Sequence, residues 1–559
     1  MYKYSPFDQR IVDERVAQFR GQVQRFVKGE LTDDELKPLR LQNGLYIQRH
    51  SPMLRVAIPY GMLAAGQLRM LASIARRYDR SYAHFTTRQN LQYNWFKLED
   101  GPEMLADLAK VEMHAIQTSG NCIRNITTDP FAGVSGDEFV DPRPYAEILR
   151  QWSTFHPEFA YLPRKFKIAL TAAVVDRAAV AVHDIGLYLR IENGDVVFDV
   201  LAGGGMGRTP IVGAVIRRSL PWQDLLSYCE AVLRVYNRHG RRDNIYKARI
   251  KILVRALGAD EFARQVEAEW QQSDRRSLAI TDAERDRVAA HFTSPDYAVL
   301  DNEPVAFTEP LQADRAFSRW VGRSVRAHKV DGYAIVTLSL KPTGVAPGDL
   351  TSDQMYAVAD LADEYAFGEL RVTHEQNLVL ADVRQADLFG LWTKLKPLGL
   401  AAANVGLLTD VICCPGGDFC ALANAKSIPI AEAIQRKFDD LDFQHDIGEI
   451  TLNMSGCINS CGHHHVGHIG ILGVDKQGDE FYQVTLGGNV GPDPETTRIG
   501  AVIGPSFSAH EVPDVLERVL AVYLAQRESE DERFVDVVQR LGIAPFKAAV
   551  YSQREATHA

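Results

Sequence analysis

The feature that most constrains the fold of this 559-residue chain is an internal repeat with a period near 285 residues. The segment FTTRQNLQ at 85–92 shares four identities with VTHEQNLV at 372–379, at an offset of 287. A second pair, FDVLAGGGMG at 198–207 and YQVTLGGNVG at 482–491, has an offset of 284. A period this long excludes a solenoid and predicts two half-molecules related by a pseudo-twofold axis.

Both halves predict the same order of elements. A strand (54–58; 334–340) precedes an amphipathic helix (65–78; 352–365), and a second strand ends at the Gln-Asn-Leu motif. The interleaving of strands and helices predicts an α+β protein with mixed sheets. Later elements are strands at 166–175 with 187–191 and at 450–454 with 469–474, a helical region at 222–270 interrupted near 238–243, and a polar connection at 271–310.

Composition and charge exclude several classes of protein. With 46% hydrophobic and 24% charged residues, the chain is too apolar to be disordered. A net charge of −10 argues against a general nucleic-acid binder. The most apolar stretch, Leu170 to Val182, is broken by Asp176 and Arg177, so no membrane span is expected. The first residues lack the pattern of a secretory signal, and a cytoplasmic location is predicted.

Five of the seven cysteines lie between Cys413 and Cys461, which indicates a metal site. Cys414 and Cys420 have five residues between them, whereas Cys457 and Cys461 have three. The first gap is wide for a zinc site, and the spacings favour a [4Fe–4S] cluster over structural zinc. If the second pair forms a helical turn, both of its thiols face one side. Spacing alone leaves Cys413 as a rival of Cys414.

These residues carry a resemblance to the sirohaem-dependent nitrite/sulfite reductase family. The cysteine pattern and the Asn453–Cys461 segment are similar to the family signature, and the duplication fits its two related halves. The resemblance extends through Thr87-Arg88-Gln89, Arg124-Asn125 and residues 162–167, and covers most of residues 45–500. Within the family, the chain looks most like the assimilatory sulfite reductase haemoproteins.

The resemblance implies a fold of duplicated half-molecules, each with a ferredoxin-like and a sirohaem-binding mixed-sheet unit. The division that we expect is an N-terminal extension (1–44), a ferredoxin-like half-domain (45–115), a sirohaem and substrate domain (116–310), a second ferredoxin-like half-domain (311–403), and a [4Fe–4S] and sirohaem domain (404–559).

The resemblance also implies the cofactor ligands. Cys414, Cys420, Cys457 and Cys461 would bind the [4Fe–4S] cluster, and Cys461 would in addition be the axial ligand of the sirohaem iron. A shared thiolate would couple the two centres directly. The chain departs from the family pattern in having Ile458 where proline is frequent, and Gly-His-His-His after the fourth cysteine where a basic residue is frequent.

Four basic residues form the expected substrate pocket. By resemblance, Arg88, Arg124, Lys165 and Lys167 bind the anion and deliver protons. Lys165 and Lys167 are two apart on a predicted strand, so their ammonium groups share a face. Lysine is the better proton donor, because its pKa falls among like charges whereas arginine stays protonated. At the offsets of the repeat, the second half has Glu375, Glu449 and Thr451 in place of Arg88, Lys165 and Lys167.

The function that we expect is the six-electron reduction of sulfite to sulfide, with nitrite reduction to ammonia as the alternative. The chain has no nicotinamide or flavin motif, so electrons would come from a separate ferredoxin or flavoprotein. A non-redox zinc protein and a tetrapyrrole-biosynthesis enzyme of the same fold are further alternatives.

Three weaker features stay open at this stage. The histidines at 463–465 and His468 are expected to contact the cofactor or pack in the core rather than share a metal ion, because adjacent residues point in different directions. The glycine runs at 203–207 and 487–491 favour a turn or a cofactor-cradling loop. The helical region also carries a cationic run. It could contact the cofactor, dock an acidic electron-donor protein, or be a solvated helix face. The run is made up of Arg238, Arg241, Arg242, Lys247, Arg249 and Lys251.

Overall fold

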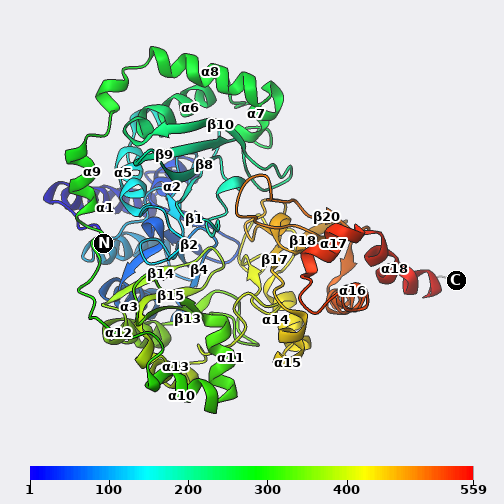
Figure 1. Ribbon diagram of the computed structural model, residues 1–559. Helices are drawn as coiled ribbons and strands as arrows, with labels where there is room; N and C mark the ends of the chain where they lie inside the picture. The colour runs from blue at the N-terminus through cyan, green and yellow to red at the C-terminus, as the bar shows by residue number, and fades with distance from the viewer. Residues whose placement is uncertain (558–559) are drawn as a thin grey trace.

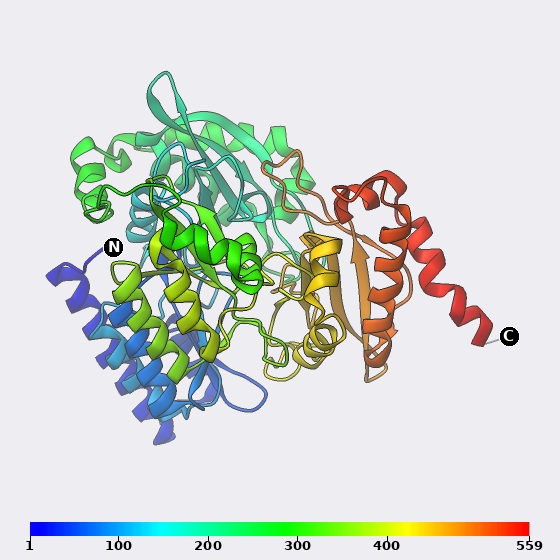
Figure 2. The same ribbon diagram turned by 60° about the horizontal axis from the view of Figure 1, so that its bottom comes forward.

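The computed structural model describes residues 1–557 and is organised around four β-sheets (Figure 1). Two sheets carry the Gln-Asn-Leu motifs, and the other two carry the glycine-rich segments of the repeat. In Figure 2, the blue and yellow-green helices of the first two sheets lie side by side, and the orange and red C-terminal part lies at the opposite end of the molecule from the N-terminus. Within residues 1–557, no helix has both the length and the apolar composition needed to cross a bilayer.

The two Gln-Asn-Leu sheets exchange one strand with each other. In each sheet four strands come from one half and the edge strand from the other half. The first sheet has the order β1 (Leu45–Ile47), β2 (Pro52–Val56), β5 (Leu91–Tyr93), β4 (Tyr82–Phe85) and β13 (Asp349–Thr351). The second has the order β11 (Val325–Ala327), β12 (Tyr333–Leu338), β15 (Leu378–Arg384), β14 (Glu369–Val372) and β3 (Met62–Ala64).

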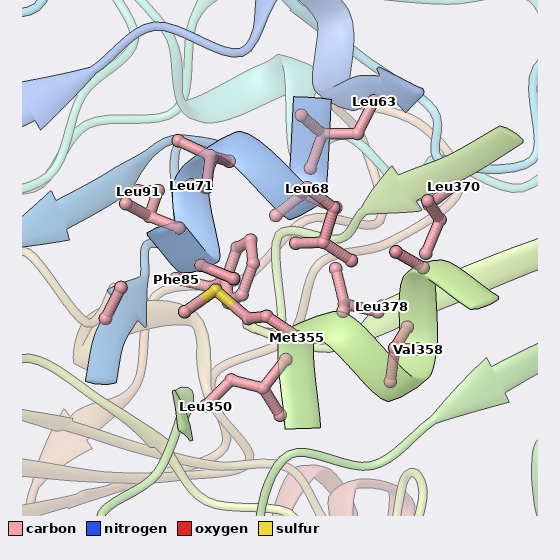
Figure 3. Close-up of a cluster of buried hydrophobic side chains, with 14 of the residues drawn as sticks. Leu63, Leu68, Leu71, Phe85, Leu91, Leu350, Met355, Val358, Leu370 and Leu378 are labelled. Carbon is pink, nitrogen blue, oxygen red and sulfur yellow. The ribbon is translucent and has the colours of Figure 1, made fainter. Parts of the chain in front are cut away.

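Each exchanged strand leads directly into a helix, and these two helices join the halves. α3 (Ala65–Tyr78) follows β3, and α12 (Ser352–Tyr365) follows β13. Both helices have the predicted bounds. Figure 3 shows Leu68 and Leu71 of α3 and Met355 and Val358 of α12 among the side chains of one cluster. All four side chains are fully buried in one hydrophobic core that spans both halves.

The repeated glutamine explains why the motif recurs. The Gln89 amide donates to the Val372 carbonyl at 2.9 Å, and the Gln376 amide donates to the Phe85 carbonyl at 2.9 Å. Each glutamine therefore binds the main chain of the opposite half. Both residues have a positive φ, 53° and 63°, a conformation that costs energy for a side-chain-bearing residue and is held here by these contacts.

The two glycine-rich sheets are mixed and share one topology. Ile168 pairs with Ile185, and Leu452 pairs with Ile469, so the registers coincide at the offset of 284. In each sheet three parallel strands are followed by an antiparallel one. The first has the order β10 (Ala214–Pro221), β9 (Asp195–Ala202), β8 (Ile185–Glu192), β7 (Ile168–Thr171) and β6 (Thr127–Thr128). The second has the order β16 (Ile412–Cys413), β17 (Leu452–Ser455), β18 (Ile469–Lys476), β19 (Asp479–Leu486) and β20 (Ala501–Val502), and β21 (Phe507–Ser508) also pairs with β19.

The remaining helices cover these sheets and the joint core. The predicted helical region at 222–270 is divided into three helices, with the main break after His239. The strand predicted at 166–175 is shorter than expected and spans only Ile168–Thr171. The division into five domains stays a prediction. The other helices are α1 (Pro6–Val27), α2 (Asp33–Gln42), α4 (Gly101–Ala109), α5 (Arg143–Ser153), α6 (Leu225–His239), α7 (Ile250–Leu257), α8 (Ala259–Gln272), α9 (Asp282–Ala289), α10 (Val305–Ala313), α11 (Arg315–Ser324), α13 (Leu388–Leu395), α14 (Ile428–Lys437), α15 (Leu441–Ile447), α16 (Val512–Gln526), α17 (Phe534–Leu541) and α18 (Ala544–Thr557).

We expect Gln89→Ala to lower the thermal stability of the protein. The substitution leaves the Val372 carbonyl and the main-chain groups of Thr128 unpaired in the core, because Gln89 bonds to all of them. The expected loss is about 2–4 kcal/mol in the free energy of unfolding. Calorimetry measures it as a lower Tm, with Gln24→Ala on the exposed face of α1 as the control. A Tm equal to that of the control would contradict the role of the cross-half bonds.

Candidate functional site: a cationic pocket beside the cysteines

One pocket brings together the basic residues and part of the cysteine cluster. Its walls come from both halves, and they include no Asp or Glu among the described residues. Of the eight predicted site residues, six line this pocket: Arg88, Arg124, Lys165, Lys167, Cys414 and Cys461.

The two lysines stand on one face of an extended segment before β7. Phe166 between them forms a parallel bridge with Ile123 and points into the core. Neither lysine ammonium makes a hydrogen bond or an ion pair with the described residues. Burial lowers the pKa of Lys165 to about 8, with Arg124 lowering it further, while Cys461 acts in the opposite direction. Burial lowers the pKa of Lys167 well below its usual range, and the charge of Lys165 lowers it further.

The two arginines are held by main-chain carbonyls. Arg88 donates to the Asn125 carbonyl at 2.6 Å. Arg124 donates to the carbonyls of Thr118 at 2.7 Å and Gly120 at 2.6 Å, and its buried Nε has no partner in the described chain. Since a guanidinium has five N–H donors, each group keeps donors for an anion. Burial lowers the pKa of Arg88 to about 9, so it is still protonated at neutral pH.

The four predicted ligand cysteines are neighbours in space. Burial raises the pKa of the Cys414 thiol to about 12, and the nearby Cys461 raises it further. Burial also raises the pKa values of Cys420 and Cys457, and Cys461 adds to both. The main-chain N–H of Gly456 donates to the Cys414 sulfur at 3.2 Å. Three thiols that each lie close to the Cys461 thiol form, together with it, a donor set that suits an iron–sulfur cluster. Within residues 1–557, no three Cys, His, Asp or Glu side chains gather around a single-ion position.

Cys413 and Cys414 both line the cationic pocket, but their other contacts differ. Cys413 belongs to the hydrophobic core of the C-terminal part, and its sulfur contacts the Cys414 carbonyl at 3.2 Å. Cys414, not Cys413, interacts electrostatically with Cys461. This difference favours Cys414 as the member of the cysteine cluster.

Cys457 and Cys461 do not lie on a helical turn, so the condition under which both thiols would face one side is not met. These residues form tight turns, and Ser460 has a φ of 54°, which interrupts a helix. The loop then returns against β17 so closely that a Cβ on Gly462 would lie 2.0 Å from the Met454 carbonyl oxygen. The close return places Cys461 in the pocket, where Thr87 donates to its carbonyl at 2.7 Å.

The histidines after the fourth cysteine have separate partners. His464 contacts the Ser460 hydroxyl at 3.1 Å, and His465 contacts the Gly207 carbonyl at 3.0 Å. His463 and His464 are buried, and burial lowers the pKa of each well below its usual range. The glycine run of the first half thus packs against the cysteine loop of the second half.

The cationic run of the helical region divides into two groups. Arg249 pairs with the buried Asp184 at 2.6 Å, and Lys251 is buried against the Met206 carbonyl at 2.6 Å. Asp184 in turn accepts from the Lys167 main-chain N–H at 2.9 Å, so it anchors the extended segment that carries both lysines. The other members of the run lie outside the core: Arg238, Arg241, Arg242 and Lys247.

Sequence reasoning missed a fifth cation of the pocket. Arg55 lines it from β2, and the Gln92 carboxamide oxygen accepts from Arg55 at 2.7 Å and 3.0 Å. The only available signal in the sequence was that Arg55 lies in the predicted strand 54–58 of the first half. Single basic residues in strands are common at surfaces, so this signal is weak.

The second half keeps a counterpart of the pocket with altered chemistry. A separate cavity is lined by Glu375, Glu449 and Thr451, which replace Arg88, Lys165 and Lys167 at the repeat offsets. At the offset of 284, Arg177 in this cavity occupies the position of Cys461. Both ring nitrogens of its buried His374 have no partner in the described chain.

Comparisons with known families agree with this architecture. The family model described as the nitrite and sulphite reductase 4Fe-4S domain matches residues 119–274 and 406–558. The model of the nitrite/sulfite reductase ferredoxin-like half domain matches residues 46–111 and 328–398. Each model matches twice, once per half, and the duplicated half-domain fold is confirmed.

Known proteins with similar sequences carry both activities in their names. A sulfite reductase [ferredoxin] of Mycolicibacterium paratuberculosis is 30% identical over 87% of this chain and 82% of its own length. A ferredoxin–nitrite reductase of Synechococcus elongatus is 28% identical over 93% of this chain and 96% of its own length. The solved NirA protein of Mycobacterium tuberculosis superposes with a TM-score of 0.74 at 26% identity, covering 93% of this chain and 92% of that chain.

The fold and the cysteine-bearing pocket thus define an oxidoreductase. The chain belongs to the nitrite and sulfite reductase family. Its cofactors are sirohaem and a [4Fe–4S] cluster, as the sequence predicts, and structural zinc is not its metal.

We expect Lys167→Met to stabilise the cofactor-free protein by about 1–2 kcal/mol, because it removes a buried cation without a partner. The folded-state pKa of Lys167 lies below its unfolded value. The free-energy cost of burying the charged Lys167 is therefore full at low pH. It disappears as the pH rises to the pKa of the unfolded chain, about 10.4. Calorimetry should give a larger gain in Tm at pH 6 than at pH 10. Lys247→Met, at an exposed site, is the control, and an equal effect from it would contradict the prediction.

Proposed function

We propose that this protein is an assimilatory sulfite reductase haemoprotein, which reduces sulfite to sulfide with six electrons. The observation that carries the proposal is the pocket with five cationic side chains and no carboxylate among its described walls. Sulfite is a pyramidal anion with three oxygens and, as the dianion, two charges. It gains more from several converging cations than nitrite, which has two oxygens and one charge.

The four cysteines are proposed as the cluster ligands. Cys414, Cys420, Cys457 and Cys461 would each bind one iron, and Cys461 would also be axial to the sirohaem iron. Two observations support the double role of Cys461. Its thiol is close enough to the other three thiols to raise the pKa of each, and together with Cys414 it lines the same pocket as the basic residues.

The basic residues are proposed to bind the anion and supply protons. When bound, the coupled sirohaem and cluster supply the electrons. Lys165 and Lys167 would hold the sulfite oxygens and donate protons as these oxygens leave as water. Lysine suits this role because the pKa of Lys165 is already lowered to about 8. Arg88 and Arg124, fixed by carbonyls, would keep the anion oriented.

The electron donor is proposed to be a ferredoxin. The relatives from Mycolicibacterium paratuberculosis and Synechococcus elongatus are both named for ferredoxin, and a flavoprotein donor is the alternative. A thiolate-bound cluster also suits a reducing compartment, so the cytoplasm is the proposed location.

Nitrite reduction is the second candidate function. It is favoured by the nitrite reductase of Synechococcus elongatus, which aligns over 96% of its own length. Both reactions take six electrons and need the same cofactors, so the preference depends on how the pocket binds the anion.

The two functions are separated by comparing turnover of sulfite and nitrite with electrochemically reduced methyl viologen. We expect the higher kcat/KM for sulfite. In the same assay Lys165→Ala should lower kcat by at least about 100-fold, the usual range for a lost proton donor, while both cofactor spectra are retained. Lys247→Ala, at an exposed site, is the control. A much higher kcat/KM for nitrite would overturn the sulfite assignment.

Cys461→Ser tests the shared ligand. We expect this variant to lose both centres or their electronic coupling, because one thiolate would serve both. Absorbance and electron paramagnetic resonance spectra of the purified protein provide the measurement. Cys229→Ser, at a buried cysteine of α6, is the matched control and should keep both spectra. Normal spectra in Cys461→Ser would refute the bridging role.

A further inference from the structure

A second cavity lies on the outer side of Arg124. It has a volume of about 500 Å³, and its walls come from α1, α2, β1, the 116–124 loop and the 153–164 segment. Arg124 and Gln117 line both this cavity and the cationic pocket. These two side chains are therefore the partition between the two spaces.

The outer cavity has the same charge sign as the pocket. Its walls contain Arg15, Arg124 and Arg164, and no Asp or Glu among the described residues. The Arg164 guanidinium is half-buried and makes no hydrogen bond or ion pair with the described chain. Burial, together with Arg124, lowers the pKa of Arg164. A half-buried cation without a partner is costly unless a mobile anion visits it.

The mouth of the cavity is bordered by exposed aromatic side chains and the N-terminal helices. Tyr161 is 66% exposed and Phe155 is 43% exposed. Arg15 of α1 donates to the Gln42 side chain at 2.7 Å, and Gln42 donates to the Tyr161 hydroxyl at 3.1 Å. This chain of hydrogen bonds links the N-terminal segment to the 153–164 segment.

We propose that the outer cavity is the vestibule through which the substrate anion reaches the cationic pocket. Arg164 would bind the anion first, and Arg124 would pass it on, because its guanidinium lies between the two spaces. The proposal rests on the proposed position of the substrate pocket, but not on the choice between sulfite and nitrite. The N-terminal segment would then form the outer wall of the route.

The first test is Arg164→Gln in the holoenzyme, with Arg164→Lys as the charge-preserving match. We expect kcat/KM for the substrate anion to fall by about 10-fold, the lower end of the range of electrostatic steering, and kcat to stay unchanged. Arg164→Lys should stay within about twofold of the wild type. The wild-type kcat/KM should also decrease with ionic strength more steeply than that of Arg164→Gln. Equal kcat/KM for wild type and Arg164→Gln at low salt would overturn the role of Arg164.

The second test uses Cys122, a half-buried residue in the wall of the vestibule. Its thiol donates to the Ser119 carbonyl at 3.2 Å and burial raises its pKa, so labelling is carried out at alkaline pH. Cys229 and Cys413 are buried, and the other four cysteines would be cofactor ligands. Treatment of the holoenzyme with N-ethylmaleimide should therefore narrow the vestibule at Cys122. We expect at least a 10-fold loss of kcat/KM, with unchanged spectra and unchanged reduction of the cofactors by viologen. Cys122→Ser, treated in the same way, should keep its activity.

The outcomes distinguish the vestibule from the proposed function. Full activity after modification of Cys122, verified by mass spectrometry, would overturn the vestibule and leave the pocket standing. If nitrite is the better substrate, the sulfite assignment fails, yet the same two tests apply with nitrite. If Lys165→Ala retains full turnover, the pocket itself is misplaced, whatever Arg164→Gln does.

Discussion

The rest of the structure depends on the reciprocal pairing of one strand from each half with the sheet of the other half. β3 and β13 are short, but each brings its helix across the pseudo-twofold axis, so α3 and α12 share one core. The glutamines of the repeated motif fix the same crossing through main-chain bonds. Because these contacts fix the two halves together, residues 88 and 461 can line one pocket although 373 positions separate them.

The pocket shows how function works against stability in this fold. Lys165 and Lys167 are held out of water with no carboxylate to balance them, although the whole chain has a net charge of −10. The positive charge is kept near the site because Asp184, the nearby acid, is already paired with Arg249. The proposed anionic substrate, together with the carboxylates of sirohaem, would supply the missing negative charge. Buried groups that raise the free energy of the empty protein are typical of functional sites.

Local patterns in the sequence predicted much of the fold. The bounds of α3 and α12 were predictable because both helices have apolar residues at helical spacing, and the repeat predicted the second copy of each sheet. The strand exchange was not predictable, since a three-residue strand carries no signal of its distant partner. The turn at Ser460 and the inward direction of Arg249 were missed for a related reason: both are set by tertiary contacts. Of the site, spacing indicated the cysteines, whereas Arg55 had no pattern to identify it.

The strand exchange also bears on how the chain folds during synthesis. β4 is the edge strand of the first sheet until β13 has been synthesised. His84 of β4 and Asp349 of β13, which pair with each other, are 265 residues apart in the sequence. At typical elongation rates of about 5–20 residues per second, this delay is roughly 13–50 s. For that time the ribosome-bound first half has an unpaired sheet edge and an uncovered face of α3. Exposed edges of this kind promote pairing with other chains, so nascent chains of this protein need shielding until the second half emerges.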